Sequence, residues 1–196
     1  MNEIETLKKY FGYDAFREGQ KELITNILQG KDVLGIMPTG AGKSICYQVP
    51  AAMMEGITLV ISPLISLMKD QVGTLNENGI RAAFFNSSLT FAQYQKALQL
   101  AKQYTYKIIY VAPERLLNDE FLAFAKQMNI AMVCVDEAHC VSQWGQDFRP
   151  HYLQIQSFLK QLPKRPIVSA FTATATSEVK ADIIRLLDMK QPFEIT

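Results

Sequence analysis

The chain has 196 residues, of which 48% are hydrophobic and 20% are charged, and its formal net charge is +1. This length suits one domain, or at most two small ones, with a sizeable core. A charge so close to neutral gives no electrostatic signature of a nucleic-acid partner, although it excludes none, because local patches matter more than the total. No apolar run approaches the roughly 18 residues needed to cross a membrane. The polar, acidic residues 1–5 predict that there is no signal peptide.

Short apolar runs alternate with helical patterns along the whole chain. The runs are typical of buried strands and cover residues 32–37, 57–62, 82–85, 107–111, 131–135, 167–171 and 193–195. Apolar residues at helical spacing cover residues 18–29, 90–103 and 176–188. A further helix should begin near Lys43, and Pro50 should kink or restart it. This alternation predicts an α/β fold with right-handed crossovers, a mostly parallel sheet and helices on both faces. The last run should be an edge strand.

The first run leads into a phosphate-binding loop, Met37-Pro38-Thr39-Gly40-Ala41-Gly42-Lys43-Ser44. Gly40 and Gly42 let the backbone turn and bring its N–H groups close to phosphates. Lys43 supplies a positive charge for the β- and γ-phosphates, and Ser44 supplies a hydroxyl for Mg²⁺. A methionine replaces the first glycine of the strict pattern, but the T-G-x-G-K core is complete. The alternative is a glycine turn before a helix with an incidental lysine.

Two acidic residues follow the run at 131–135. Asp136 should lie at the carboxyl end of a strand, where ligands bind in open α/β sheets, and it is suited to orient Mg²⁺ through water. Glu137 is suited to polarise an attacking water molecule. His139 is adjacent, so we interpret it as a coupling residue rather than an ordinary histidine. Together with the phosphate loop, these residues predict hydrolysis of a nucleoside triphosphate.

The segment before the first strand contains side chains of the kinds that can hold an adenine base. The amide of Gln20 can pair with adenine, because it offers one acceptor and a donor. Tyr13 and Arg17 can stack on the two sides of the base. Gln20 could instead be a surface glutamine that caps a helix.

An aromatic loop, defined here as residues 140–152, follows the acidic residues directly. It contains the only tryptophan, Trp144, together with Phe148 and Arg149. Aromatic side chains stack on bases regardless of sequence, and arginine binds phosphate, so this loop is a candidate site for single-stranded nucleic acid. Trp144 could instead anchor the core, but the loop-forming residues Gly145 and Pro150 argue against that.

Two other segments follow predicted strands. Ser62 and Pro63 precede a helix start that could bind a phosphodiester backbone, although any strand–loop–helix connection looks similar. Thr172 and Thr174 end the run at 167–171, and threonine is also an ordinary strand residue.

The three cysteines predict reduced thiols in a cytosolic protein, because their number is odd and their spacing is not that of metal ligands. A zinc site built from Cys134, His139, Cys140 and His151 is disfavoured, because Cys134 falls in a predicted strand and no C-x₂-C pair is present. The third cysteine, Cys46, lies in the helix that follows the phosphate loop.

Taken together, these segments resemble the first RecA-like motor domain of RecQ-type DNA helicases of superfamily 2, over about residues 10–176. The resemblance implies a P-loop NTPase fold for residues 1–196, ATP and Mg²⁺ as cofactors, and 3′-to-5′ unwinding of DNA in recombination or repair. It implies catalytic roles for Lys43, Asp136, Glu137 and His139. It implies DNA contacts by Ser62, Pro63, Trp144, Phe148 and Arg149. It implies that Gln143, Thr172 and Thr174 couple DNA binding to hydrolysis.

The chain departs from this family at two positions. Glu18 stands where proline is usual, and Gln146 stands where histidine is more common, so a role tied to that histidine is not carried over. The family also has a second motor domain with an arginine finger, a zinc-binding region and a winged helix, which these 196 residues do not contain. We therefore expect weak ATP binding and slow hydrolysis by this chain alone. The expected partners are single-stranded or duplex DNA and the second motor domain, in the bacterial cytoplasm or nucleoid and with no membrane contact.

Two other functions remain open on the sequence. One is an RNA helicase of the D-E-A-D or D-E-A-H type, against which the Trp-Gly…Asp-Phe-Arg-Pro loop argues. The other is a P-loop nucleotide switch that acts by binding partners, against which the adenine segment and the aromatic loop argue.

Overall fold

The computed structural model describes residues 1–38 and 40–196, so the predicted cofactor residue Thr39 lies outside the described residues. In this part of the chain, seven strands form one sheet in the order β3-β4-β2-β5-β6-β1-β7, and all paired neighbours are parallel. The strands are β1 (Val33–Ile36), β2 (Ile57–Ile61), β3 (Ala82–Phe85), β4 (Ile108–Val111), β5 (Ile130–Val135), β6 (Ile167–Thr172) and β7 (Phe193–Ile195). The predicted parallel sheet is confirmed, and β7 is an edge strand.

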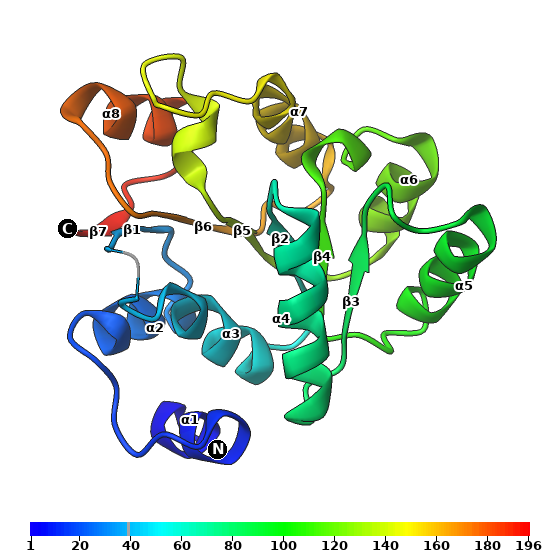
Figure 1. Ribbon diagram of the computed structural model, residues 1–196, viewed down its shortest axis with the longest axis horizontal. Helices are drawn as coiled ribbons and strands as arrows, with labels where there is room; N and C mark the ends of the chain where they lie inside the picture. Colours follow the sequence, from blue (N-terminus) through cyan, green and yellow to red (C-terminus); the bar gives the residue numbers. More distant parts are fainter. Residues whose placement is uncertain (39) are drawn as a thin grey trace.

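Helices cover both faces of the sheet, as the sequence predicts (Figure 1). One face packs against α2 (Gln20–Leu28), α3 (Lys43–Met53) and α4 (Ile65–Glu77). The other face packs against α5 (Phe91–Ala101), α6 (Asp119–Gln127), α7 (Gln154–Gln161) and α8 (Ser177–Leu186). Helix α1 (Glu3–Phe11) lies outside these layers, where Leu7 contacts the apolar side chains of α2 and α3. No helix in the described residues has both the length and the apolar character needed to cross a bilayer.

Helix α3 runs through Pro50 without restarting, so that part of the prediction is wrong. Proline lacks the N–H that would bond to the carbonyl one turn earlier. The helix nevertheless continues for one more turn, because the N–H of Met54 donates to the Pro50 carbonyl at 2.9 Å. Every residue from 45 to 51 is buried, so packing on all sides compensates for the lost bond.

A buried carboxylate ties together the loops that precede β1, β6 and β7. Asp32 is 3% exposed. It accepts hydrogen bonds from Arg165 Nη2 at 2.6 Å, the Val168 N–H at 2.9 Å and the Lys190 N–H at 2.8 Å. Val168 lies in β6 and Lys190 lies shortly before β7, so Asp32 fixes where β6 and the segment leading to β7 lie relative to β1.

A buried network of hydrogen-bonded polar side chains links α3, α4 and β4. The Tyr47 and Tyr110 hydroxyls lie 3.1 Å apart, and both approach Gln71 Oε1. Gln48 Nε2 donates to the Tyr110 hydroxyl at 2.9 Å. Burial raises the pKa of both tyrosines, so they remain neutral donors at physiological pH. A connected network of this kind is stabilising only while every member keeps a partner.

We therefore expect Tyr110→Phe to lower the free energy of unfolding by about 1–3 kcal/mol, because it leaves the buried Gln48 amide without its acceptor. Tyr94→Phe is the matched control. The Tyr94 hydroxyl is buried and has no hydrogen-bond partner among the described residues, so its removal should leave stability unchanged or slightly higher. Urea unfolding of both variants measures the difference, and equal losses would contradict the role assigned to the network.

The strand order brings the predicted motifs together at one edge of the sheet. Strands β5, β6 and β1 are neighbours, so the acids after β5, the threonines at the end of β6 and the phosphate loop after β1 all meet at their carboxyl ends. The Met37 N–H donates to the Thr172 carbonyl at 2.9 Å, which extends the pairing of β1 and β6 into the loop.

Candidate functional site

The phosphate loop ends where α3 begins, with Gly42 as N-cap and Lys43 as the first helical residue. Gly42 has a φ of 75°, a left-handed conformation that favours glycine, and a Cβ there would also displace the Gln20 amide, whose Nε2 would lie 2.4 Å away. The free N–H groups and the positive dipole end of α3 face the loop, as anion binding requires. Ser44, in the first turn, is half-buried.

Gln20 lies 3% exposed, so the alternative of a surface glutamine is wrong. Its amide joins the N-terminal segment to the phosphate loop. Oε1 accepts from the Arg17 N–H at 2.8 Å, and Nε2 donates to the Gly42 carbonyl at 3.0 Å. The Arg17 guanidinium also donates to the carbonyl of Gly40. Sequence reasoning missed this bridge, because its partners lie more than twenty positions away.

The predicted adenine residues border a hollow of about 410 Å³ between α1, α3 and α4. Tyr13, which is 53% exposed, lines it together with Arg17, Gln20 and Ser44. A flat base fits a site with an aromatic ring and a guanidinium on its walls. Adenine binding by Gln20 stays a prediction, since its amide already bonds to the backbone.

The acidic residues take different environments at the end of β5. Asp136 is 7% exposed, and its burial, together with the adjacent Glu137 carboxylate, raises its pKa to about 6. Glu137 adopts a left-handed backbone with a φ of 50°, which is unfavourable for a residue with a side chain. Its carboxylate lies 4.0 Å from Lys43 Nζ. Such strain is found at functional sites, where surrounding contacts hold the residue in place.

His139 joins the acidic residues to the end of β6. Its Nδ1 lies 2.7 Å from Thr172 Oγ1 and 3.5 Å from Glu137 Oε2. Thr172 Oγ1 also lies 3.2 Å from the Thr174 carbonyl oxygen. Which of the two groups donates in the histidine–threonine bond depends on the tautomer of His139. The structure thus brings together His139, Thr172 and Thr174, three of the four residues expected to couple the sites, whereas Gln143 lies on the exposed loop.

The aromatic loop presents Trp144 to solvent. The indole is 76% exposed, so the alternative of a core anchor is wrong. Gly145 allows a tight turn, because a Cβ there would lie 2.9 Å from the His139 carbonyl oxygen. Phe148 and Arg149 are half-buried, Gln143 is exposed, and Arg149 Nη2 pairs with Asp147 Oδ2 at 3.2 Å.

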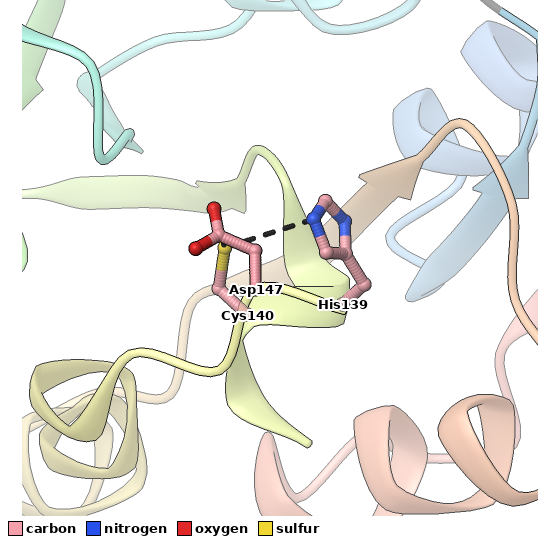
Figure 2. Close-up of side chains that lie close together, drawn as sticks. All are labelled: His139, Cys140 and Asp147. Atoms are coloured by element: carbon pink, nitrogen blue, oxygen red, sulfur yellow. Dashed lines mark hydrogen bonds between the residues drawn. The ribbon is translucent and has the colours of Figure 1, made fainter. Parts of the chain in front are cut away.

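Three potential metal ligands lie close together where this loop begins: His139, and Cys140 and Asp147 of the loop itself (Figure 2). Their ligand atoms lie within 4.8 Å of one another. However, Arg149 already supplies a positive charge to Asp147, and burial raises the pKa of the Cys140 thiol to about 12, whereas metals bind the thiolate. We therefore assign no metal to this group. Cys134 and His151 are not part of it, and all three cysteines are free and buried.

The segment after β2 differs from the expected DNA contact. Ser62 is 1% exposed, and its hydroxyl accepts from the Leu64 N–H at 3.4 Å, just before α4 begins. Its side chain therefore shapes the connection, and burial argues against a direct contact between Ser62 and DNA. Pro63 is half-buried, and its contact with DNA stays a prediction.

The parallel sheet, with its phosphate loop and acidic residues at the carboxyl ends of adjacent strands, defines a RecA-like nucleotide-binding domain. The family model described as DEAD/DEAH box helicase matches residues 17–182. The chain therefore belongs to the DEAD/DEAH box helicase family.

Curated relatives include the ATP-dependent DNA helicases RecQ of Bacillus subtilis and Pasteurella multocida. Each is 48% identical to this chain, over 94% and 96% of its length respectively. The chain spans 32% and 30% of these relatives, or about a third of their length.

Two solved structures share the fold. A hypothetical ATP-dependent RNA helicase from Sulfolobus tokodaii has a TM-score of 0.75 at 24% identity, over 100% of this chain and 57% of that one. The DNA-bound DUF1998 helicase MrfA has a TM-score of 0.77 at 18% identity, over 100% of this chain and 29% of that one.

Proposed function

We propose that this chain is the ATP-binding motor domain of a RecQ-like DNA helicase and that residues 1–196 act together with a second motor domain. The observation that carries the proposal is the contact of His139 with both Glu137 and Thr172, next to the exposed Trp144. It connects a hydrolytic acid to a loop suited to bind bases. The relatives named RecQ support DNA as the partner, and unwinding with 3′-to-5′ direction in recombination or repair belongs to the same proposal.

Nucleotide binding is assigned to residues at the carboxyl edge of the sheet. Lys43 neutralises the β- and γ-phosphates, and the start of α3 donates backbone N–H groups to them. The Ser44 hydroxyl and the buried Asp136 carboxylate are hard oxygen donors at the end of the phosphate loop and of β5, which fits Mg²⁺. When bound, Mg²⁺ neutralises charge that develops on the phosphates. Glu137 orients the attacking water, and Lys43 at 4.0 Å keeps its carboxylate near the phosphates.

DNA binding is assigned to the aromatic loop. Trp144 is free to stack on a base, and Arg149 can exchange its pairing with Asp147 for a phosphate. A change at the loop reaches the hydrolytic residues through the backbone, because Trp144 lies five residues after His139. Thr172 and Thr174 continue this connection toward the end of β6.

We expect Trp144→Ala to weaken binding of single-stranded DNA by about 1–3 kcal/mol, because that is the usual loss when one stacked base loses its aromatic partner. Binding of a Mg-ATP analogue should be unchanged. Fluorescence anisotropy of a labelled oligonucleotide measures the affinity for DNA, and titration with a fluorescent nucleotide measures the affinity for the Mg-ATP analogue. Phe91→Ala is the matched control, because Phe91 is also 76% exposed but lies on α5. Equal losses in the two variants would contradict the assignment.

The same assay separates the alternatives. Single-stranded RNA bound more tightly than DNA would favour an RNA helicase of the same family. A preference for GTP over ATP, without a response to either nucleic acid, would favour a nucleotide switch.

A further inference from the structure

A carboxylate outside the motifs holds the aromatic loop. The Ser142 hydroxyl donates to Asp182 Oδ2 at 2.7 Å, and Ser142 Oγ accepts from the backbone N–H of Trp144 at 3.1 Å. Ser142 is fully buried, and 15% of the Asp182 side chain is exposed. Asp182 lies on α8, forty positions along the chain, and α8 packs beside the loop at the upper left of the molecule (Figure 1).

The number of protons on the Ser142 hydroxyl determines which group donates in the hydrogen bond with Asp182. A hydroxyl has one proton and two lone pairs. Because an ionised carboxylate can only accept, the proton of Ser142 must point to Asp182, which leaves a lone pair for the Trp144 N–H. Asp182 also pairs with Arg185 Nη2 at 2.9 Å. The hydrogen bond from Ser142 and this guanidinium lower the pKa of Asp182, so it is ionised at neutral pH.

We propose that Asp182 is a positioning residue for the aromatic loop: by fixing the Ser142 hydroxyl, it holds the backbone at Trp144 so that the indole is presented to single-stranded DNA. This proposal rests on the proposed function. Helix α8 is well placed for the role, because Val179, one turn before Asp182, lines a hollow of about 390 Å³ together with Trp144 and Thr172. Movement of the aromatic loop relative to α8 would change the shape of this hollow, which Trp144 and the coupling residues line together.

Asp182→Ala and Asp182→Asn test the proposal, because asparagine keeps a carbonyl oxygen that can accept from Ser142 and alanine does not. Trp144 is the only tryptophan, so time-resolved fluorescence anisotropy reports its local motion directly. Asp182→Ala should increase the nanosecond motion of the indole and weaken DNA binding by up to roughly tenfold, the loss expected for one hydrogen bond. Asp182→Asn should stay near the unmodified chain, and affinity for a fluorescent ATP analogue should change in neither.

Two control variants exclude simpler causes. Glu178→Ala removes an exposed carboxylate from the same helix and should change neither the motion nor the affinity. Arg185→Met removes the ion pair of Asp182 while leaving the Ser142 bond, and it should behave in the same way. The proposal is overturned if Asp182→Ala leaves the motion of Trp144 unchanged. It is also overturned if asparagine is as disruptive as alanine, because the charge rather than the bond would then matter.

Failure of the proposed function gives a different pattern. If Trp144→Ala binds DNA as tightly as the unmodified chain, the loop is not the DNA site. Increased motion of the indole in Asp182→Ala, rescued by asparagine, would then still show that Asp182 positions the loop.

Discussion

Asp32→Ala is expected to lower the free energy of unfolding by about 2–4 kcal/mol, because a buried donor left without its acceptor costs about 1–3 kcal/mol, whereas the partly exposed Arg165 can turn to water. The change removes the acceptor of two backbone N–H groups, those of Val168 and Lys190, and leaves the Arg165 guanidinium without its partner. Domains are typically stable by only about 5–15 kcal/mol, so this single carboxylate accounts for a large share of the total.

Urea unfolding, followed by far-ultraviolet circular dichroism, measures the loss. Asp14→Ala is the matched control, because Asp14 forms an exposed ion pair with Lys8 at 3.6 Å, and 86% of its side chain is accessible. Such surface pairs contribute little, so the control should stay within about 0.5 kcal/mol of the unmodified chain. A loss for Asp32→Ala no larger than the control would show that Arg165 and the backbone groups find water or other partners.

Asp136→Asn is expected to stabilise the metal-free fold while it removes Mg²⁺-dependent nucleotide binding. The pKa of Asp136 rises from 3.8 to about 6 in the folded chain. The folded state therefore binds this proton more tightly than the unfolded state does. Stability contributed by the protonated form is present below about pH 4 and is lost as the pH rises through about 6. Asparagine is neutral at every pH, so the variant should be more stable at pH 7.5 by about 1–3 kcal/mol.

The pH dependence separates this effect from other consequences of the change. In the presence of a chelator, the difference in unfolding free energy between Asp136→Asn and the unmodified chain should approach zero near pH 4. Affinity for a Mg-ATP analogue at pH 7.5 should fall roughly 100-fold, as for other residues that orient a metal ion without binding it directly. A variant that binds Mg-ATP normally would remove Asp136 from the metal site, whatever its stability.

The sequence predicts most of the sheet, because each strand is a short, continuous apolar run. The run at 82–85 and the one at 193–195 coincide with β3 and β7. The acidic and phosphate-loop motifs could also be located, since a parallel sheet places the residues after its strands at one edge. The exposure of Trp144 follows from the loop-forming residues around it.

Other features depend on partners far away in the sequence. Lys190 lies 158 positions from Asp32, and no local pattern indicates that the two meet. The burial of Ser62 and the contact of Asp182 with Ser142 likewise depend on residues that are distant in the sequence. Helix α1 is a different case, because Asn2 and Glu5 form a capping box, which is a local signal for the start of a helix. The catalytic and ligand-contact roles of the site residues remain predictions.

The position of β1 in the sheet determines when the nucleotide site can form during synthesis. Both neighbours of β1 come from late in the chain, β6 from Ile167 and β7 from Phe193. At translation speeds of roughly 5–20 residues per second, the phosphate loop waits on the order of ten seconds for these partners. During that time β1 is an unpaired apolar strand, so the nascent chain offers a target for chaperones and for aggregation. ATP cannot assist the early folding of these residues, because its proposed binding site is complete only after β6 and β7 have been synthesised.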